Sequence, residues 1–307
     1  MRPAAPVTAT SDATELADWF EARTLETADQ NVAIQDLVRL IHRGGSASDV
    51  DEDRRLVSDR EESAAEDAFN ELQYRAVACG GDPYPFDIRS DYVQLRDTSE
   101  GSVYLFLLLL SIYGKDAGPA EIEAEKLFEE LCAAAIRSYF GGEALGARAY
   151  LFGFPRRLTP TGFASAVDDL CLNMREGIGN RQRPDSADQK DAKLDVVAWR
   201  DFPDLAPGKL IGFGQCATGR NWTEKLTDLQ PQDFCTLWMA DRPAVWPIRA
   251  FFTPFRVPQR KWATYSVRAG ILFDRCRIAY HLHALSVDLR DQCRAWVSGV
   301  RSEASKL

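Results

Sequence analysis

Histidine and closely paired cysteines, the residues that build zinc sites, are scarce in this chain of 307 residues. It has three histidines, and its seven cysteines, at positions 79, 132, 171, 216, 235, 276 and 293, never form a CxxC pair. Zinc sites need such ligands at close spacing, so this pattern argues against one. An odd and scattered set also argues against a disulfide framework. We therefore expect reduced thiols, as in a cytosolic protein.

Long apolar runs are missing too. The longest extends from Tyr104 to Leu110 and continues to Tyr113. A membrane-spanning helix needs about 20 apolar residues, so this run predicts a buried core helix. The first residues, MRPAAPVTATSDATE, have no apolar stretch after a basic start and therefore give no secretion signal. We expect a cytoplasmic protein with no membrane partner.

Several familiar catalytic motifs are absent. The sequence contains no GxxxxGK[ST] loop, no GxGxxG after a strand, no GxSxG and no HxxxH pair. These motifs hold nucleotide phosphates, dinucleotides, a serine nucleophile or catalytic zinc. Their absence disfavours ATP hydrolysis, dinucleotide chemistry, α/β-hydrolase activity and zinc peptidase activity by this chain.

Charge divides the chain into two unlike parts. Residues 1–140 carry 13 Lys and Arg against 28 Asp and Glu, whereas residues 141–307 carry 24 against 18, within a total of −9. A basic part can hold phosphates, and an acidic part beside it can restrict access or bind a partner. The alternative is an ordinary solvated acidic face. The turn KDAGP separates a predicted acidic helical domain, residues 1–117, from a second domain, residues 118–307.

Periodicity gives the elements of each domain. In the first we predict helices over 12–43, 56–77 and 103–113, and a short strand within 84–95. In the second we predict helices over 120–140, 162–175 and 221–229, strands over 147–154, 194–199, 210–217, 234–239 and 245–252, a polar loop over 177–190, and a helical C-terminal end that closes this domain.

Two of these strands each carry one polar side chain among apolar neighbours. Side chains two apart share a face of a strand, so Asp195 lies with Val197 and Trp199. Gln215 likewise lies on the apolar face of the next strand. Burying a carboxylate or an amide without a partner costs a few kcal/mol. Two such side chains on adjacent strands indicate a metal site.

These residues resemble the core of the PD-(D/E)XK nucleases, and most of all the Mrr-like branch, over roughly residues 120 to 255. That branch ends its second motif strand in Gln-x-Lys, and the triplet here is Gln215-Cys216-Ala217. The missing lysine has a candidate replacement in Lys225, eight residues after Ala217. In the preceding helix, Glu129 within FEEL aligns with the glutamate that approaches the metal in the family.

The resemblance implies an α/β (α+β) fold with a restriction-endonuclease-like αβββαβ core after an N-terminal helical domain. It also implies a metal-dependent endonuclease that hydrolyses phosphodiester bonds in bacterial restriction or anti-phage defence. We expect DNA as the substrate, and the sequence leaves RNA open as the alternative. Asp195, Gln215 and Glu129 would hold Mg²⁺ or Mn²⁺, with Asp191 as a further ligand, and Lys225 would assist catalysis. Self-association stays open. The rival hypothesis is an inactive nuclease fold that binds nucleic acid or serves as a scaffold.

Basic residues near aromatic ones suggest where a nucleic acid would bind. The segment RVPQRKW brings Arg256, Arg260 and Lys261 together with Trp262, and Arg220 follows the second motif strand. Such residues contact phosphates and stack on bases. A plain solvated loop has the same composition, so we keep both interpretations.

Overall fold

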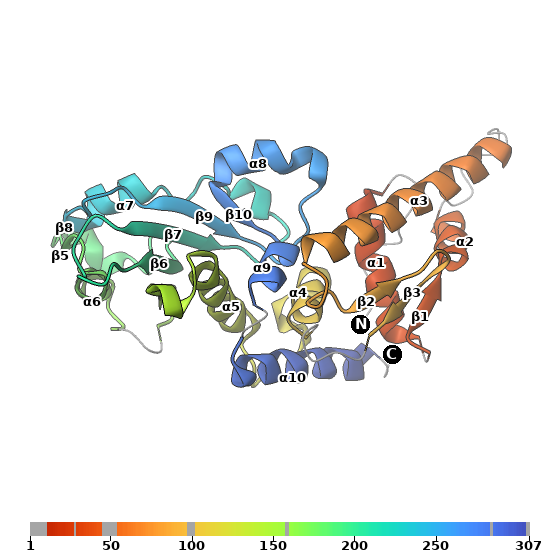
Figure 1. Ribbon diagram of the computed structural model, residues 1–307, viewed down its shortest axis with the longest axis horizontal. Coiled ribbons are helices and arrows are strands. Elements are labelled where there is room, and N and C mark those ends of the chain that lie inside the picture. Colours follow the sequence, from red (N-terminus) through yellow and green to blue (C-terminus); the bar gives the residue numbers. More distant parts are fainter. Residues whose placement is uncertain are drawn as a thin grey trace. The chain divides into compact units, whose positions relative to one another are not determined.

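Short β-branched and aromatic runs alternate with longer amphipathic ones, and the resulting strands and helices form two compact units (Figure 1). The computed structural model describes residues 11–304 except 28, 45–53, 97–101, 157–159 and 283–284. Unit 1 comprises Met1–Ala124, Phe255–Pro258 and Arg275–Leu307, and unit 2 comprises Glu125–Pro254 and Gln259–Asp274. The chain thus mixes helices with both antiparallel and parallel strands, as an α+β protein does.

Unit 1 is mainly helical, with one small antiparallel sheet in the order β1-β3-β2. Its elements are α1 (Ala13–Glu26), β1 (Asn31–Ala33), α2 (Ile34–Gly44), α3 (Arg54–Ala78), β2 (Phe86–Ile88), β3 (Tyr92–Leu95), α4 (Ser102–Tyr113), η1 (Lys115–Ala117), α9 (Arg275–His281) and α10 (Val287–Ala304). The expected helix over 12–43 is wrong as one element, because β1 interrupts it and pairs with β3.

The two ends of the chain pack together in unit 1. Helix α4 is apolar on nearly all sides and buried, and α10 packs against it. Trp296 of α10 meets Phe106 of α4 edge to face, with ring centroids 5.1 Å apart. The C-terminal helix therefore completes unit 1, whereas the sequence analysis placed it in the second domain.

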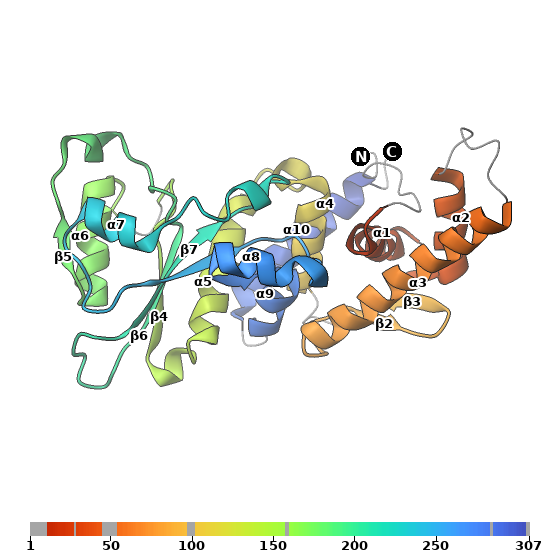
Figure 2. The same ribbon diagram turned by 90° about the horizontal axis from the view of Figure 1, so that it is seen from above.

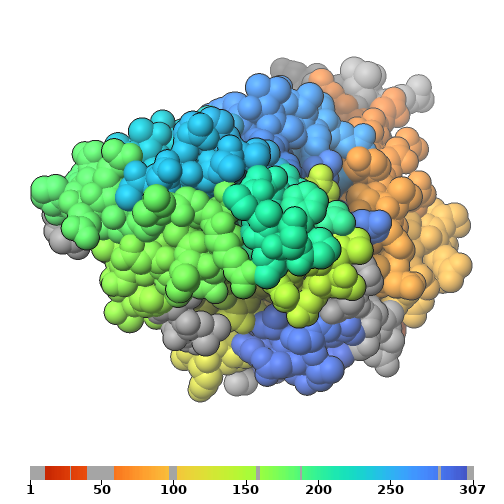
Figure 3. Space-filling view, turned by 60° about the vertical axis from the view of Figure 1, so that its left-hand side comes forward, coloured from red at the N-terminus to blue at the C-terminus, as the bar shows by residue number. Residues whose placement is uncertain are grey.

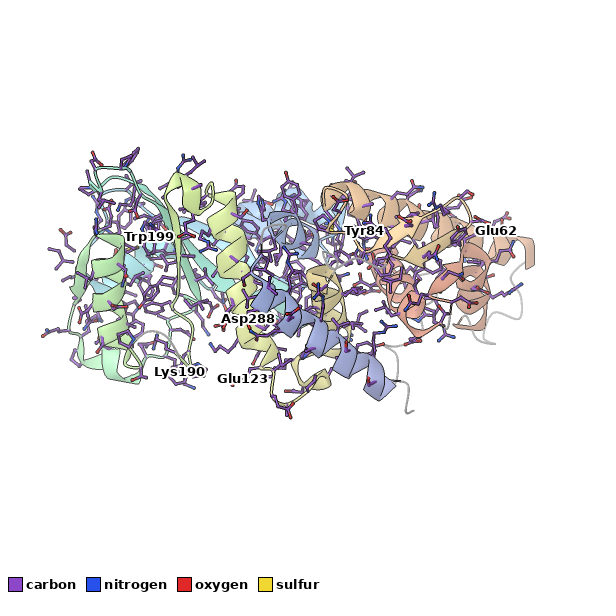
Figure 4. The ribbon with its side chains drawn as sticks, turned by 60° about the horizontal axis from the view of Figure 1, so that its bottom comes forward. Glu62, Tyr84, Glu123, Lys190, Trp199 and Asp288 are labelled. Carbon is purple, nitrogen blue, oxygen red and sulfur yellow. The ribbon has the colours of Figure 1, made fainter. Side chains whose placement is uncertain are left out.

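A buried ionic network lies in the same unit. Arg75, fully buried, binds Asp18 at 2.7 Å, Glu21 at 2.9 Å and Glu71 at 3.0 Å. Arg275 reaches the same Asp18 at 2.8 Å. The network also takes in hydroxyl groups, including that of Tyr84, labelled in Figure 4, which donates to Glu21 at 2.7 Å. It joins α1, α3 and α9 through hydrogen-bonded charges.

Unit 2 is built on a five-stranded mixed sheet in the order β10-β9-β7-β6-β4. Its elements are α5 (Ala124–Tyr139), η2 (Glu143–Leu145), β4 (Ala147–Leu151), α6 (Phe163–Met174), β5 (Ile178–Asn180), η3 (Pro184–Asp188), β6 (Val196–Arg200), β7 (Leu210–Cys216), η4 (Trp222–Glu224), α7 (Pro231–Trp238), β8 (Met239–Asp241), β9 (Ile248–Phe252), η5 (Gln259–Lys261), α8 (Trp262–Ala269) and β10 (Ile271–Phe273). Strands β4, β6 and β7 are antiparallel neighbours, and β7, β9 and β10 run parallel.

Helices cover both faces of this sheet (Figure 2). On one face α5 lies so close that a Cβ on Gly212 of β7 would stand 2.9 Å from Phe140 and 3.2 Å from Ile136. On the other face Phe213 belongs to an apolar cluster that includes Phe163 of α6 and Phe234 of α7. The sheet is therefore the central layer of unit 2.

Two predictions for the segment after β7 are wrong. Residues 234–239 form most of α7 and the start of β8 rather than a strand, because Pro231 opens a helix whose buried side holds Phe234, Cys235 and Trp238. The expected helix over 221–229 is only the 3-10 turn η4.

The predicted polar loop over 177–190, which precedes β6, is not entirely irregular. It contains β5, which pairs with β8.

Two other expectations bear on the chemistry of the chain. All seven cysteines are free thiols, as their spacing predicts. Within the described ranges, no helix has both the length and the apolar character needed to cross a membrane.

Candidate functional site

Two carboxylates from distant segments meet beside Gly153, just past the end of β4. A Cβ on Gly153 would stand 2.8 Å from Glu129 Oε2 and 3.2 Å from Asp195 Oδ1. Glu129 comes from α5, and Asp195 immediately precedes β6. The absence of a side chain at Gly153 is therefore what lets the two predicted site residues lie next to each other.

Asp195 is held firmly by the strands on either side of it. Its N–H donates to the carbonyl of Gly214 at 3.0 Å, and its carbonyl accepts from Phe152 at 2.7 Å and Gly153 at 2.9 Å. Its carboxylate Oδ2 accepts the backbone N–H of Cys216 at 2.7 Å. The side chain thus stands at a fixed place at the end of the sheet, with Oδ1 beside Gly153.

Both carboxyl groups are electrostatically strained. Burial raises the pKa of Asp195 well above its usual range, and repulsion from Glu129 and Asp191 adds to this effect, although the N–H of Cys216 opposes it. Burial likewise raises the pKa of Glu129, against the opposing hydrogen bond from Lys126. Neighbouring carboxyls that resist ionisation are typical of sites that bind a cation or exchange protons.

Gln215 carries a buried oxygen on the neighbouring strand. The next pair in the register after Val196 and Gly214 sets Asp195 opposite Gln215. Gln215 is only 5% exposed, and among the described residues its Oε1 has no hydrogen-bond partner. A buried amide oxygen without a partner costs about 1–3 kcal/mol, so this oxygen lacks a donor or a cation.

Lys126 is the lysine of this site, and the sequence analysis missed it. Its Nζ lies 2.7 Å from Glu129 Oε2, both side chains are mostly buried, and its charge also acts on Asp195. Lys225 instead ends the turn η4, and in the described part of the chain no hydrogen bond or ion pair joins it to Glu129 or Asp195. The three-residue spacing on one helix was the available signal, since residues i and i+3 are neighbours.

Asp191 lies in a tight loop just before Asp195. Ala192 and Lys193 have φ angles of 51° and 69°, which is uncommon for residues other than glycine. Asp191 Oδ1 accepts the N–H of Lys193 at 2.9 Å. Asp191 therefore acts on the two carboxyls through its charge while its own side chain stabilises the turn.

Arg156, which no sequence pattern marked, joins the segment before this loop to the residue after β4. It is nearly buried, stacks 4.7 Å over the Phe152 ring, and donates to the carbonyls of Thr161 and Lys190. Figure 4 labels Lys190, just before the loop, and Trp199, near the end of β6. The order of residues along the chain gives no sign of this contact.

Two thiols lie near the Asp195 and Glu129 carboxylates. Cys132 of α5 and Cys216 of β7 hydrogen-bond to each other, and burial raises the pKa of both. Thiols that stay protonated are poor metal ligands, because the thiolate is the binding form. The donor atoms of the site are therefore oxygens.

The predicted nucleic-acid-binding residues do not form one group. Arg256 belongs to unit 1, is buried, and binds Glu71 at 2.9 Å with its guanidinium 5.1 Å from the Tyr74 ring. Its side chain is therefore neither exposed for the expected phosphate contact nor part of a solvated loop. Arg220, Arg260 and Lys261 belong to unit 2 and are exposed. These three stay candidates for phosphate contacts.

Adding one methyl group tests the meeting of the carboxylates. We expect Gly153→Ala to displace Glu129, because the new Cβ would overlap its Oε2, and to weaken any divalent-cation binding at least tenfold in isothermal titration. Gly162→Ala is the control, since its Cβ would meet only Ser165 at an ordinary 3.6 Å. Equal cation affinity of the Gly153→Ala and native proteins would place the cation site elsewhere.

The described residues contain no group of three or more His, Cys, Asp or Glu side chains arranged to hold a metal ion. A cation at Gly153 would therefore need ligands besides Asp195 and Glu129, and Gln215 and Asp191 are the predicted ones. Comparison with known proteins gave no match to a family model, to a curated protein or to a solved structure.

Proposed function

We propose that unit 2 is a metal-dependent nuclease that hydrolyses phosphodiester bonds, with DNA as the preferred substrate. The observation that carries the proposal is the meeting of the Asp195 and Glu129 carboxylates at Gly153. The buried, unpartnered oxygen of Gln215, on the strand next to Asp195, adds to it. Each of these residues was singled out by its resemblance to PD-(D/E)XK nucleases, and they come from three separate elements. A restriction or anti-phage role belongs to the same proposal.

The order of elements supports it. Helix α5, strands β4, β6 and β7, helix α7 and strand β9 follow one another in the αβββαβ order that the resemblance implies, with α6 and β5 inserted after β4 and β8 inserted after α7. The three antiparallel strands and the parallel β9 lie side by side in the sheet. This arrangement brings the start of β6 and the end of β7 together at one end of the sheet, where Asp195 and Gln215 lie.

The donor set suits a hard divalent cation. Oxygens of Asp195, Glu129 and Gln215 would hold Mg²⁺ or Mn²⁺, and such an ion supplies charge neutralisation and an activated water during phosphodiester hydrolysis. The chain's own contribution is to fix Asp195 through the N–H of Cys216 and to keep Glu129 beside it. With two carboxylates and one neutral amide, the site carries less negative charge than one with three carboxylates.

Lys126 has the position for a catalytic cation. Its ammonium lies at 2.7 Å from Glu129 and has three donors, so it can turn toward a phosphate oxygen once Glu129 binds a metal. Ala217 is buried where the family lysine would stand. Lys126 on α5 is therefore a better replacement than Lys225.

A comparison of two lysine variants tests this assignment. We expect Lys126→Met to lower the cleavage rate about 100-fold, the usual effect of removing one group that stabilises transition-state charge, and Lys225→Met to lower it less than threefold. Initial rates on a plasmid at saturating Mg²⁺ give the measurement. The reverse order of effects would return the catalytic role to Lys225.

The activity itself is tested on the full chain. Plasmid DNA, single-stranded DNA and RNA are each incubated with Mg²⁺, Mn²⁺ or a chelator, and Asp195→Asn serves as the inactive control. We expect cleavage of DNA that needs the cation and is absent from the variant. If no substrate is cut and excess Mg²⁺ or Mn²⁺ leaves the melting temperature unchanged, unit 2 is a binding or scaffolding domain instead.

A further inference from the structure

A cavity of about 530 Å³ opens in unit 2 where α6 begins. Its lining comes from the first residues of α6, the end of β5 and the loop that follows: Gly162, Phe163, Ala164, Asp168, Asn180, Gln182, Arg183, Pro184 and Ser186. The green part of the chain that contains these segments lies at the surface in Figure 3. Asp195, Glu129 and Gln215 do not line this cavity.

The start of α6 offers backbone donors. Its N-cap is Gly162, which has no side chain to accept from the first-turn N–H groups, and no side-chain cap bond replaces it. Phe163 and Ala164, the first two helical residues, line the cavity. The positive end of a helix of 12 residues with an uncapped first turn favours a negatively charged group.

Two buried polar atoms of the lining have no hydrogen-bond partner among the described residues. One is the hydroxyl of Ser186, a residue that is 6% exposed. The other is Asn180 Oδ1. Buried polar atoms are normally satisfied, so these two atoms call for a ligand that both accepts from a hydroxyl and donates to an amide oxygen.

The charges of the lining set the kind of ligand. Arg183 is exposed, pairs with Asp185 at 3.2 Å, and lies 5.9 Å over the Trp238 ring. Asp168 is the acidic member of the lining, and its Oδ1 accepts the N–H of Asn180 at 2.6 Å. The Asp168 carboxylate therefore holds β5 in place. Its remaining lone pairs can accept a hydrogen bond from a hydroxyl or amino group of a ligand.

We propose that this cavity binds one nucleotide unit. The phosphate would accept from the first turn of α6, the Ser186 hydroxyl and Arg183, while a sugar hydroxyl or base amino group would donate to Asn180 Oδ1 and Asp168. The cavity has the size of small-molecule sites and exceeds what a single phosphate needs. The proposal goes beyond the nuclease activity and does not depend on it.

The nucleotide can come from two sources, a free mononucleotide or the end of a nucleic-acid strand. Isothermal titration of the full-length Asp195→Asn protein, without divalent cations, compares four probes: a nucleoside 5′-monophosphate, the same nucleoside, inorganic phosphate, and a 5′-phosphorylated oligonucleotide. We expect the monophosphate to bind at least tenfold more tightly than the nucleoside or the inorganic phosphate. Comparable binding of the oligonucleotide identifies a strand end as ligand, and its absence identifies a free nucleotide.

Ser186→Ala separates a binding role from a structural one. Because its hydroxyl has no partner, we expect its removal to leave the melting temperature of the free protein unchanged or slightly higher, and to weaken monophosphate binding at least fivefold. Arg183→Ala should weaken it about tenfold. Arg148→Ala is the matched control, since Arg148 is an exposed arginine that pairs with Glu143 outside the cavity.

Two results would overturn the inference. One is a nucleoside that binds as tightly as the monophosphate, which would show that the cavity does not recognise the phosphate. The other is the failure of all four probes to bind at millimolar concentration. Neither result would bear on cleavage at Asp195, which is assayed separately with the native chain.

Discussion

The Asp195→Asn protein is expected to melt at a higher temperature than the native chain at neutral pH, while losing cleavage and the stabilisation by Mg²⁺ or Mn²⁺. The neutral amide oxygen can still accept the N–H of Cys216, so the local hydrogen bond survives. The charge that burial, Glu129 and Asp191 oppose is removed. Under the proposed function, this variant would lose activity and gain stability through a single side chain.

The effect has a defined dependence on pH. Because the folded-state pKa of Asp195 is raised, the folded protein holds this proton more tightly than the unfolded chain does. The corresponding stability is fully present below the ordinary pKa of an aspartate and is lost as pH rises through the raised folded-state pKa. Each unit of displacement amounts to about 1.4 kcal/mol. The native and variant proteins should therefore melt alike in acid and diverge toward neutral pH.

Melting curves over a pH series, with and without cation, give the measurement. Glu143→Gln is the control, because Glu143 is an exposed carboxylate whose side chain is 69% accessible. Its melting temperature should stay close to that of the native chain at every pH. An Asp195→Asn protein that melts below the native chain at neutral pH, in the absence of cation, would show that the carboxylate stabilises the fold instead.

Arg75→Met is expected to destabilise unit 1 by about 3–5 kcal/mol, the usual cost of breaking a buried ion pair by removing one partner. Asp18, Glu21 and Glu71 would each lose a hydrogen-bonded guanidinium and stay buried or nearly so. The carbonyl of Thr14, which accepts from Arg75 at 2.8 Å, would also be left without this donor. The methionine fills much of the volume, so the loss is mainly electrostatic.

Hydrogen exchange of the amides in α1 and α4 measures this loss within unit 1, without assuming that both units unfold together. Arg89→Met is the matched control, because Arg89 is 60% exposed and pairs with Asp87 at 3.5 Å. Exposed pairs contribute about 0–1 kcal/mol. A loss below about 1 kcal/mol for Arg75→Met would show that Arg275 and Arg256 suffice for the three carboxylates.

The elements that hold the site could be predicted wherever local composition decides the structure. Strands β6 and β7 were expected within two residues of their observed bounds, because each is a run rich in β-branched, aliphatic or aromatic residues that is bounded by turn residues. The segment 234–239 was mistaken for a strand because a short apolar run fits a buried helix equally well. Pro231 was the signal that could have decided it.

The arrangement of the site could be predicted only in part. Asp195 and Gln215 stood out because a polar side chain on an apolar strand is conspicuous, and a family resemblance pointed to Glu129. Lys126 lies in a helix rich in charge, so its three-residue spacing from Glu129 did not set it apart from the other charged residues. Arg275 binds Asp18 across 257 residues, a contact that only the folded chain reveals.

Unit 1 is built from both ends of the chain, and this has a consequence for biosynthesis. Residues 125–274, which contain all of unit 2, leave the ribosome before Arg275 and α10, so unit 2 can fold while α1 and α4 still lack these partners. A product released after residue 274 would hold every residue of the candidate site and an incomplete unit 1. If unit 1 restrains a nuclease, premature termination in this region would release an unrestrained one.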